Sequence, residues 1–188
     1  MLKKVKGEYG YISKSKKKDV IMLLLYLAIA AAIFFAGLLL NNMSYTNIFT
    51  VVAILFVLPW ARVLVDLIVF LPYKTPDEEK YQQVKDRASS EAKVLSDVVI
   101  TSEEKSMGMD FMVLGNGYIY AVTANKKQDK SYIQNYLKKG VDNRSDRYQV
   151  QIFERYEEFL KKVSDAKEKE LDEREKEEVE AFILSLFV

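Results

Sequence analysis

The chain has 188 residues, and its 28 Lys and Arg nearly balance its 27 Asp and Glu, so the formal net charge is only +1. This balance argues against a nucleic-acid partner, which usually meets a strongly basic surface. The absence of cysteine and histidine excludes disulfides, zinc ribbons, thiol nucleophiles, Ser-His-Asp triads and histidine–metal sites. We therefore expect no cofactor and a protein that is not an enzyme.

The first long feature is an uncharged stretch over residues 20–40, which follows a lysine-rich segment over 1–19. At about 1.5 Å per residue in a helix, such a stretch spans the roughly 30 Å hydrocarbon core of a bilayer. It is also longer than the hydrophobic region of a typical signal peptide. The sequence therefore predicts a transmembrane helix over 20–40.

A second apolar stretch, over 47–71, follows after the short loop 41–46 and is interrupted by Pro59, Arg62 and Asp66. The short loop makes the two helices antiparallel neighbours. Pro59 predicts either a kink or the end of a short span, with an interfacial helix after it. Arg62 and Asp66 lie one helical turn apart, so we expect an intramembrane ion pair and favour it over a transport path.

Lysine placement predicts the orientation of this hairpin. Lysines crowd the segment before the first span, whereas the loop between the spans carries no charge, so both termini of this multi-pass chain should be cytoplasmic at the cell membrane. We expect four of these lysines to contact anionic lipid, each contributing on the order of 1 kcal/mol. They are Lys14, Lys16, Lys17 and Lys18.

Small residues recur along the first span at Ala28, Ala32 and Ala36. A stripe of this kind lets another helix approach closely. We expect its partner to be the second span of the same chain, and the alternative is a homo-oligomer formed through this face.

Residues 72–188 predict a cytoplasmic α+β domain with the element order αβββαβα. Asn116-Gly117 indicates a tight hairpin, Asp129 a helix N-cap and Gly140 a helix end. The predicted elements are a helix over 77–92, strands over 95–101, 109–115 and 117–124, a helix over 129–140, a strand over 148–154 and a long helix over 155–187.

This order is also that of the restriction-endonuclease-like core, which needs an acidic residue on the second strand and a Glu-x-Lys on the third. Asp110 fits the second strand, but residues 119–123 contain no carboxylate, and the next lysines are Lys126 and Lys127. The sequence thus predicts, at most, such a core without its active site. Asp110 remains a weak catalytic candidate, and no metal site is predicted.

Two apolar features need a place in the domain. Tyr118 and Tyr120 could form a stacking platform for bases, but their alternation with Ile119 favours packing on both faces of the sheet. The apolar segment 181–188 must also be covered. The alternatives, in order of preference, are the domain's own sheet, another subunit and the membrane interface.

The segment KGEYGYI at 6–12 and the apolar stretch 47–71, together with the strand–helix domain, resemble a family of small two-span bacterial membrane proteins. Members are sometimes labelled O-linked GlcNAc transferase-like. A glycosyltransferase of that kind needs two Rossmann-like domains, which about 115 residues do not supply, so the resemblance implies architecture and no activity.

Together these features predict a transmembrane hairpin with a cytoplasmic domain that mediates protein interaction or self-association. The expected partners are membrane lipids and either another protein or a second copy of the chain. Two alternatives stay open: a membrane-tethered, degenerate nuclease-like domain centred on Asp110 with Lys126 or Lys127, and a ligand-gated membrane effector.

Overall fold

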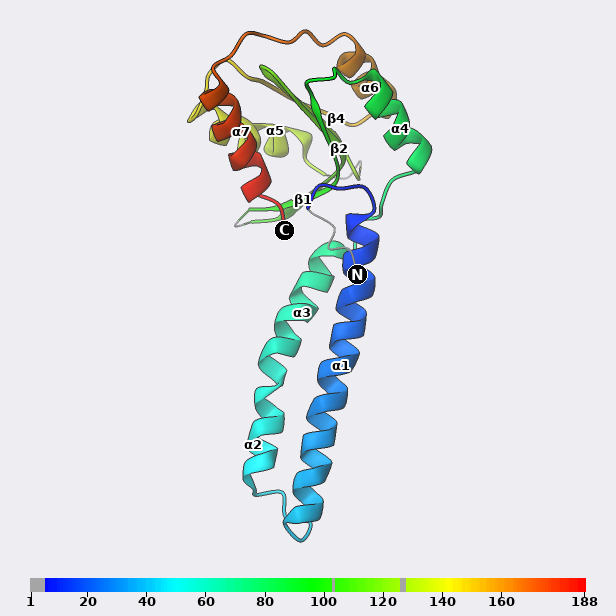
Figure 1. The fold of residues 1–188 in the computed structure, drawn as a ribbon, viewed down its shortest axis with the longest axis vertical. Helices are drawn as coiled ribbons and strands as arrows, with labels where there is room; N and C mark the ends of the chain where they lie inside the picture. The colour runs from blue at the N-terminus through cyan, green and yellow to red at the C-terminus, as the bar shows by residue number, and fades with distance from the viewer. Residues whose placement is uncertain (1–5, 103, 126–127) are drawn as a thin grey trace. The chain divides into compact units, whose positions relative to one another are not determined.

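The computed structural model describes residues 6–102, 104–125 and 128–188, and the chain divides into two compact units. One unit is the segment Ser13–Pro72, and the other joins the N-terminal residues up to Ile12 to Tyr73–Val188. Figure 1 shows the elements of both units. The N-terminal residues therefore do not form one separate segment up to residue 19, because residues 6–12 belong with the α+β domain.

The first unit contains two helical stretches that are long and apolar enough to span a membrane, Tyr11–Leu40 and Ile48–Phe70. Helix α1 (Tyr11–Leu40) begins well before the apolar stretch, because the lysines that precede the stretch are good helix formers. The second stretch consists of α2 (Ile48–Leu55) and α3 (Val57–Phe70), with a break at Phe56. Pro59 has no N–H for the carbonyl of Leu55, so the expected interruption near this proline is confirmed.

The contact between α1 and α2 is built around Gly37. Gly37 is buried, and a Cβ atom there would lie 2.4 Å from the Cβ of Phe49. Asn47 caps α2 by accepting a hydrogen bond from the Thr50 N–H at 3.0 Å. A glycine at this point lets the two helix backbones approach closely.

The prediction that the alanine stripe of the first span packs against the second span is wrong. Ala28, Ala32 and Ala36 are exposed, because α1 turns the face of Gly37 and Leu38 toward the second stretch. Adjacent helix positions lie about 100° apart around the axis, so a stripe ending one residue before Gly37 points elsewhere.

The charged residues of the hairpin also differ from expectation. Among the residues that the structure describes, no ion pair joins Arg62 to Asp66, and both side chains are exposed. Both side chains lie on the exposed surface of α3, and their spacing of four residues does not by itself bring the two charges into contact. Lys16 donates a hydrogen bond to the carbonyl of Leu71 at 3.0 Å, while Lys14, Lys17 and Lys18 are exposed.

The second unit is an α+β domain around a four-stranded mixed sheet. The strand order is β1-β2-β3-β4, where β1–β3 are antiparallel neighbours and β4 runs parallel to β3 after the crossover helix α5. The elements are α4 (Glu78–Arg87), β1 (Lys93–Thr101), β2 (Ser106–Gly115), β3 (Tyr118–Thr123), α5 (Lys130–Asp142), β4 (Gln149–Phe153), α6 (Tyr156–Ser164) and α7 (Glu173–Ser185).

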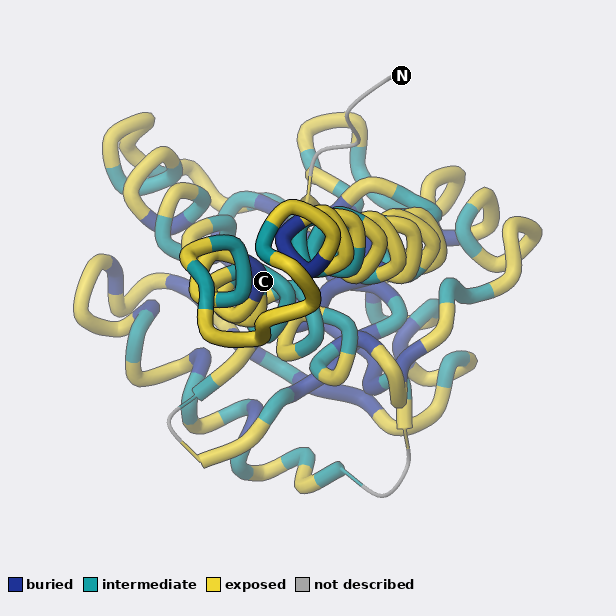
Figure 2. Tube along the Cα trace, turned by 90° about the horizontal axis from the view of Figure 1, so that it is seen from below, coloured by how far each residue is buried: buried dark blue, intermediate teal, exposed yellow. Residues whose placement is uncertain are grey.

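Helices cover both faces of this sheet. Figure 1 shows α4 and α6 on one side and α5 and α7 on the other. The strands between them are largely buried, and Figure 2 draws the buried residues in dark blue. Ile119 and Ile152 pack toward α5 and α7, whereas Tyr118, Tyr120 and Phe159 pack together on the opposite face. The prediction that the two tyrosines alternate with Ile119 in the interior is confirmed.

The long C-terminal helix predicted over 155–187 is wrong, because residues 165–172 are not helical between α6 and α7. The backbone N–H of Lys169 donates to the carbonyl of Asn116 at 2.9 Å, and the Glu168 carboxylate accepts from the Tyr118 hydroxyl at 2.9 Å and from the Asn116 N–H. These contacts with the β2–β3 turn replace helical hydrogen bonds.

Gly140 does not end its helix as predicted, since α5 continues to Asp142. A Cβ atom at Gly140 would lie 2.1 Å from the Cζ of Phe182, so the glycine admits the ring of α7. The N-cap prediction is confirmed: Asp129 accepts from the Tyr132 N–H at 3.0 Å.

The apolar C-terminus packs on the domain's own sheet, which was the preferred alternative. Ile183 and Phe187 are buried in the interior on the α5–α7 side. Phe187 pairs with Ile100 of β1, and the Val188 N–H donates to the carbonyl of Val99 at 3.0 Å. The segment therefore covers part of the outer edge of β1.

Candidate functional site

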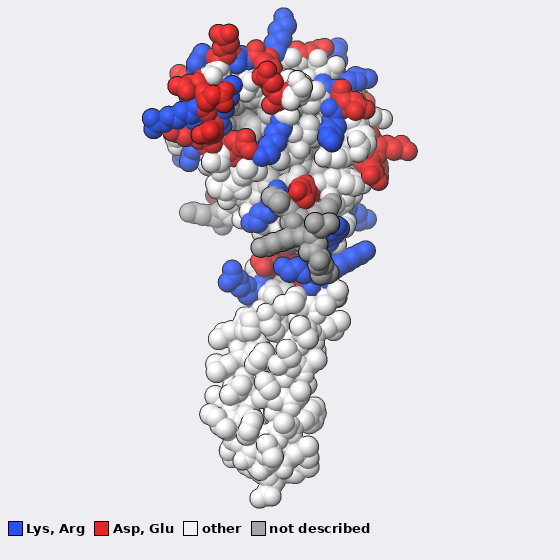
Figure 3. All heavy atoms as spheres, in the orientation of Figure 1, with Lys and Arg blue, Asp and Glu red and all other residues white. Residues whose placement is uncertain are grey.

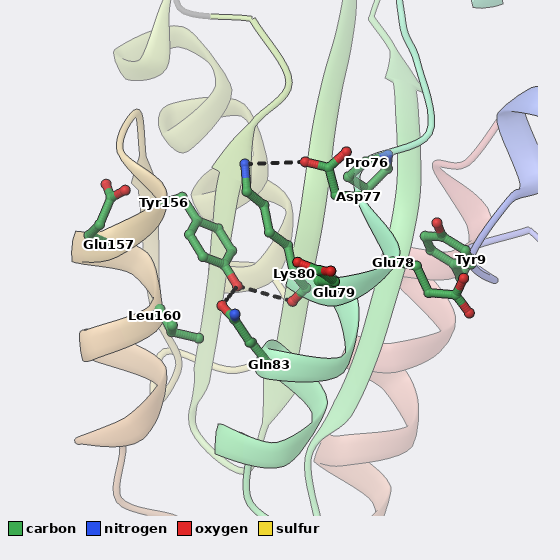
Figure 4. Close-up of a pocket in the computed structure, with 10 residues that line it drawn as sticks. All are labelled: Tyr9, Pro76, Asp77, Glu78, Glu79, Lys80, Gln83, Tyr156, Glu157 and Leu160. Atoms are coloured by element: carbon green, nitrogen blue, oxygen red, sulfur yellow. Dashed lines mark hydrogen bonds and ion pairs between the residues drawn. The ribbon is translucent and has the colours of Figure 1, made fainter.

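An open groove of about 920 Å³ lies between α4 and α6, and we call it the α4–α6 groove (Figure 4). Three separate parts of the chain line it: the N-terminal segment, the start of α4 and the start of α6. Its charged and aromatic lining residues are Asp77, Glu78, Glu79, Lys80, Glu157, Tyr9 and Tyr156.

The acidic side of the groove follows from how α4 begins. Pro76 precedes the helix, and Glu78 and Glu79 occupy its first turn, where carboxylates are favoured by the partial positive charge of a helix N-terminus. The Asp77 carboxylate lies 3.7 Å from the Lys80 ammonium, and both side chains are largely exposed. The groove therefore presents solvated carboxylates along one helix end.

Tyr156 joins the two helices. Its hydroxyl lies 3.0 Å from the carbonyl oxygen of Lys80 and 3.1 Å from Oε1 of Gln83, so its one proton is shared between two acceptors on α4. Lys80 Nζ lies 5.4 Å from the centre of the Tyr156 ring, a cation–π distance. Figure 4 shows Lys80 between Asp77 and this ring.

Tyr9 brings the N-terminal segment to the groove. Its ring stacks on Tyr81 of α4 with 5.0 Å between centroids, and Tyr81 in turn stacks on the buried Phe111 of β2 at 6.5 Å. Offset ring pairs at these distances stabilise an aromatic cluster beyond simple burial. The rim residue Tyr9 is therefore connected to the interior of the sheet.

Asp110, the weak catalytic candidate, lies half-buried on β2. Burial raises the pKa of its carboxyl to about 6, against the opposing effect of Lys80, and the charges of Asp97 and Asp77 raise it further. Asp97 is buried on β1 with φ +55°, and the β1–β2 ladder is interrupted between Asp97 and Asp110. Asp110 can therefore exchange a proton near neutral pH.

The carboxylates of the described residues are not grouped as a metal centre. In the part of the chain that the structure describes, no three Asp or Glu residues are grouped so as to hold a metal ion. The third strand, Tyr118–Thr123, carries no carboxylate, and Lys126 and Lys127 lie outside the described residues. The third strand therefore does not supply the second carboxylate that a nuclease site of this type needs.

A second hollow, of about 510 Å³, lies beside α7 and has a different electrostatic character. Its Glu180 pairs with Lys93 and its Glu173 with Lys176, whereas Glu177 is exposed. The basic residues lining this hollow thus engage two of its acids. The α4–α6 groove has four carboxylates and a single lysine in its lining.

Reasoning from the sequence missed the α4–α6 groove, although it named Asp110. The only local signal in the sequence is the acidic turn that follows Pro76. Tyr9 and Tyr156 are far from this turn in the sequence, and only the folded chain brings them to the groove. The predicted site residues of the hairpin lie in the other unit. The face of this unit drawn in Figure 3 carries charge only near one end.

Comparison with known proteins gives no further information about this site. No protein-family model, no curated protein and no solved structure matches the chain.

Proposed function

We propose that the chain is a membrane-anchored, non-enzymatic module whose α4–α6 groove binds a positively charged segment of a partner protein in the cytoplasm. The observation that carries this proposal is the excess of carboxylates in the groove beside two tyrosine rings. Asp77, Glu78, Glu79 and Glu157 are all exposed, and Lys80 is already shared between Asp77 and Tyr156.

The chemistry of the groove suits lysine and arginine side chains. Carboxylates accept charge-assisted hydrogen bonds from ammonium and guanidinium groups, and tyrosine faces attract the same cations. Complementary charge also speeds encounter and rejects acidic partners. Nothing in this arrangement requires a chemical step, which agrees with a binding function.

The hairpin supports the membrane part of the proposal. Two stretches are long and apolar enough to span a bilayer, and Lys14, Lys17 and Lys18 are exposed just before the apolar part of α1. Lysines at this point favour a cytoplasmic location and contact with anionic lipid. Anchoring confines the groove to a layer beneath the membrane and so raises its effective concentration toward other membrane proteins.

Two finer proposals concern ancestry and assembly. The order α4-β1-β2-β3-α5-β4 supports a restriction-endonuclease-like core without its active site, within the two-span family that the sequence resembles. The exposed stripe of Ala28, Ala32 and Ala36 supports self-association through α1 as a second mode of interaction.

Site-specific photocrosslinking in native membranes tests the groove. A photoreactive residue is placed at Glu79 in one variant and at Glu177, the exposed acid of the second hollow, in the control. We expect a discrete adduct from Glu79 that is lost when Glu78→Lys and Glu157→Lys reverse the charge of the groove.

Equal adducts from Glu79 and Glu177, or an adduct that survives the charge reversal, would reject the groove as the binding surface. Mass spectrometry of the adduct then reports whether the crosslinked segment is basic. Size-exclusion chromatography of the charge-reversed protein in detergent checks that it remains folded.

A further inference from the structure

The segment Lys6–Tyr11 lies along the outer edge of β1, beside the last two residues of the chain. Gly7 accepts a hydrogen bond at its carbonyl from the Ser96 N–H at 2.9 Å. Lys6 Nζ also donates to the carbonyl of Phe187 at 2.7 Å, and the Tyr11 hydroxyl donates to the carbonyl of Val188 at 3.4 Å. Residues from both ends of the chain thus meet on one strand edge.

The two C-terminal residues are themselves bound to β1. The Val188 N–H donates to the carbonyl of Val99. Val99 lies three residues after Ser96, and the Ser96 N–H donates to the carbonyl of Gly7. In a regular strand, residues an odd number apart face opposite edges. Asp97, with φ +55°, lies between them and supplies the irregularity that turns both groups to the same edge.

Gly7 packs closely against the ring of Phe187. Its φ is +85°, and a Cβ atom there would lie 2.9 Å from Cε2 of Phe187 and 3.1 Å from Cδ2 of Leu95. The ring is buried, with only 5% of its residue exposed. A side chain at position 7 would therefore strain the backbone and press on the ring at the same time.

We propose that Phe187 and Val188 form a latch that holds residues 6–11 against β1. Because Tyr11 is the first residue of α1, a closed latch makes the start of this helix part of the α+β unit, and an open latch releases it. The edge of an exposed strand is a natural place for a reversible contact, since its hydrogen bonds can be exchanged for others.

The same segment carries Tyr9, whose ring stacks on Tyr81 and lines the α4–α6 groove. A ligand that displaces Tyr9 from the groove would also move residues 6–11, and this movement would change the position of the start of α1. This last step rests on the proposed function, whereas the latch itself does not.

Hydrogen–deuterium exchange of the intact protein in lipid nanodiscs, without any partner, tests the latch. The Ser96 amide is the reporter because Gly7 is its acceptor, and the Ile119 amide on the internal strand β3 is the reference. In Phe187→Ala we expect the exchange rate of the Ser96 amide to rise about tenfold or more, because the loss of the ring makes local opening of residues 6–11 more frequent. The exchange rate of Ile119 should not change.

Two further variants keep the test decisive. Gly7→Ala leaves the C-terminal residues intact and should raise exchange at Ser96 as Phe187→Ala does. Phe182→Ala removes a ring of α7, the helix that precedes Phe187. This ring packs on Gly140 and Arg144, so its loss should leave exchange at Ser96 unchanged.

Unchanged exchange at Ser96 in both Phe187→Ala and Gly7→Ala would overturn the latch. An equal rise in Phe182→Ala would also overturn it, because the effect would then report general loosening of α7. Since no partner is present, neither result depends on whether the groove binds one.

Discussion

Replacement of Asp110 by Asn should make the protein more stable above about pH 6 and leave its stability unchanged below about pH 3. Burial raises the pKa of Asp110 from 3.8 to about 6, and Asp97 and Asp77 add to the rise while Lys80 opposes it. The folded protein thus binds this proton more tightly than the unfolded chain. Stability is therefore lost as the pH rises between these two values, and the full cost remains above about 6.

The size of the effect follows from the two pKa values of Asp110. A change from 3.8 to about 6 corresponds to about 3 kcal/mol at most, at 1.36 kcal/mol for each pH unit. Asp110 is only half-buried, so solvent screens part of this cost, and we expect about 1–2 kcal/mol. Asparagine has a similar shape and never ionises, so it avoids the penalty.

Thermal unfolding of the full chain in detergent, followed by circular dichroism, measures this difference. At about pH 8 we expect the Tm of Asp110→Asn to lie several degrees above the parent, since 1 kcal/mol shifts Tm by about 4 °C in a domain of this size. At about pH 3 the two should coincide, because Asp110 is then mostly protonated in both the folded and the unfolded state. Asp86→Asn, which alters an exposed carboxylate of α4, should show no such dependence. An equal gain at both pH values would refute the argument from burial.

Three other substitutions, each with a matched control variant, test packing and capping. Phe159→Ala should lower the free energy of unfolding by about 3–5 kcal/mol, because the ring is fully buried, whereas Leu160→Ala, at a half-exposed position, should cost less in the same denaturant titration. Asp129→Ala should cost about 1 kcal/mol through loss of the N-cap, and Asp129→Asn should recover most of it. Gly37→Leu should separate the hairpin helices and increase protease cleavage of the loop between them, whereas Ala36→Leu, at an exposed position, should not.

Elements with local signals could be predicted from the sequence. Asn116-Gly117 forms the predicted hairpin, with Gly117 at φ +89°, because few other residues adopt this conformation cheaply. Asp129 caps its helix because a short carboxylate reaches the N–H groups of the first turn. The apolar segment 181–188 is covered by the domain because exposing it would be unfavourable.

Features that depend on distant contacts could not be predicted in this way. The charge run that predicts one long C-terminal helix has good helix-forming residues, but Glu168 and Lys169 bind the turn at Asn116 instead. Gly140 has the local signature of a helix end, and only the position of Phe182 shows that it serves close packing. The α4–α6 groove is of the same kind, because three separate segments line it.

The lysines near the N-terminus show how one compositional signal can cover several physical roles. Lys6 holds the carbonyl of Phe187 and Lys16 that of Leu71, so neither ammonium is wholly available to a lipid headgroup. Lys14, Lys17 and Lys18 are exposed on α1, and the expected attraction to anionic lipid therefore rests mainly on these three. The latch contact is made by Lys6, whereas the proposed lipid contact is made by lysines of α1, so different residues serve the latch and the lipid contact. A change in lipid charge should then act on α1 without breaking the hydrogen bond that Lys6 makes, and the latch can open or close at constant lipid composition.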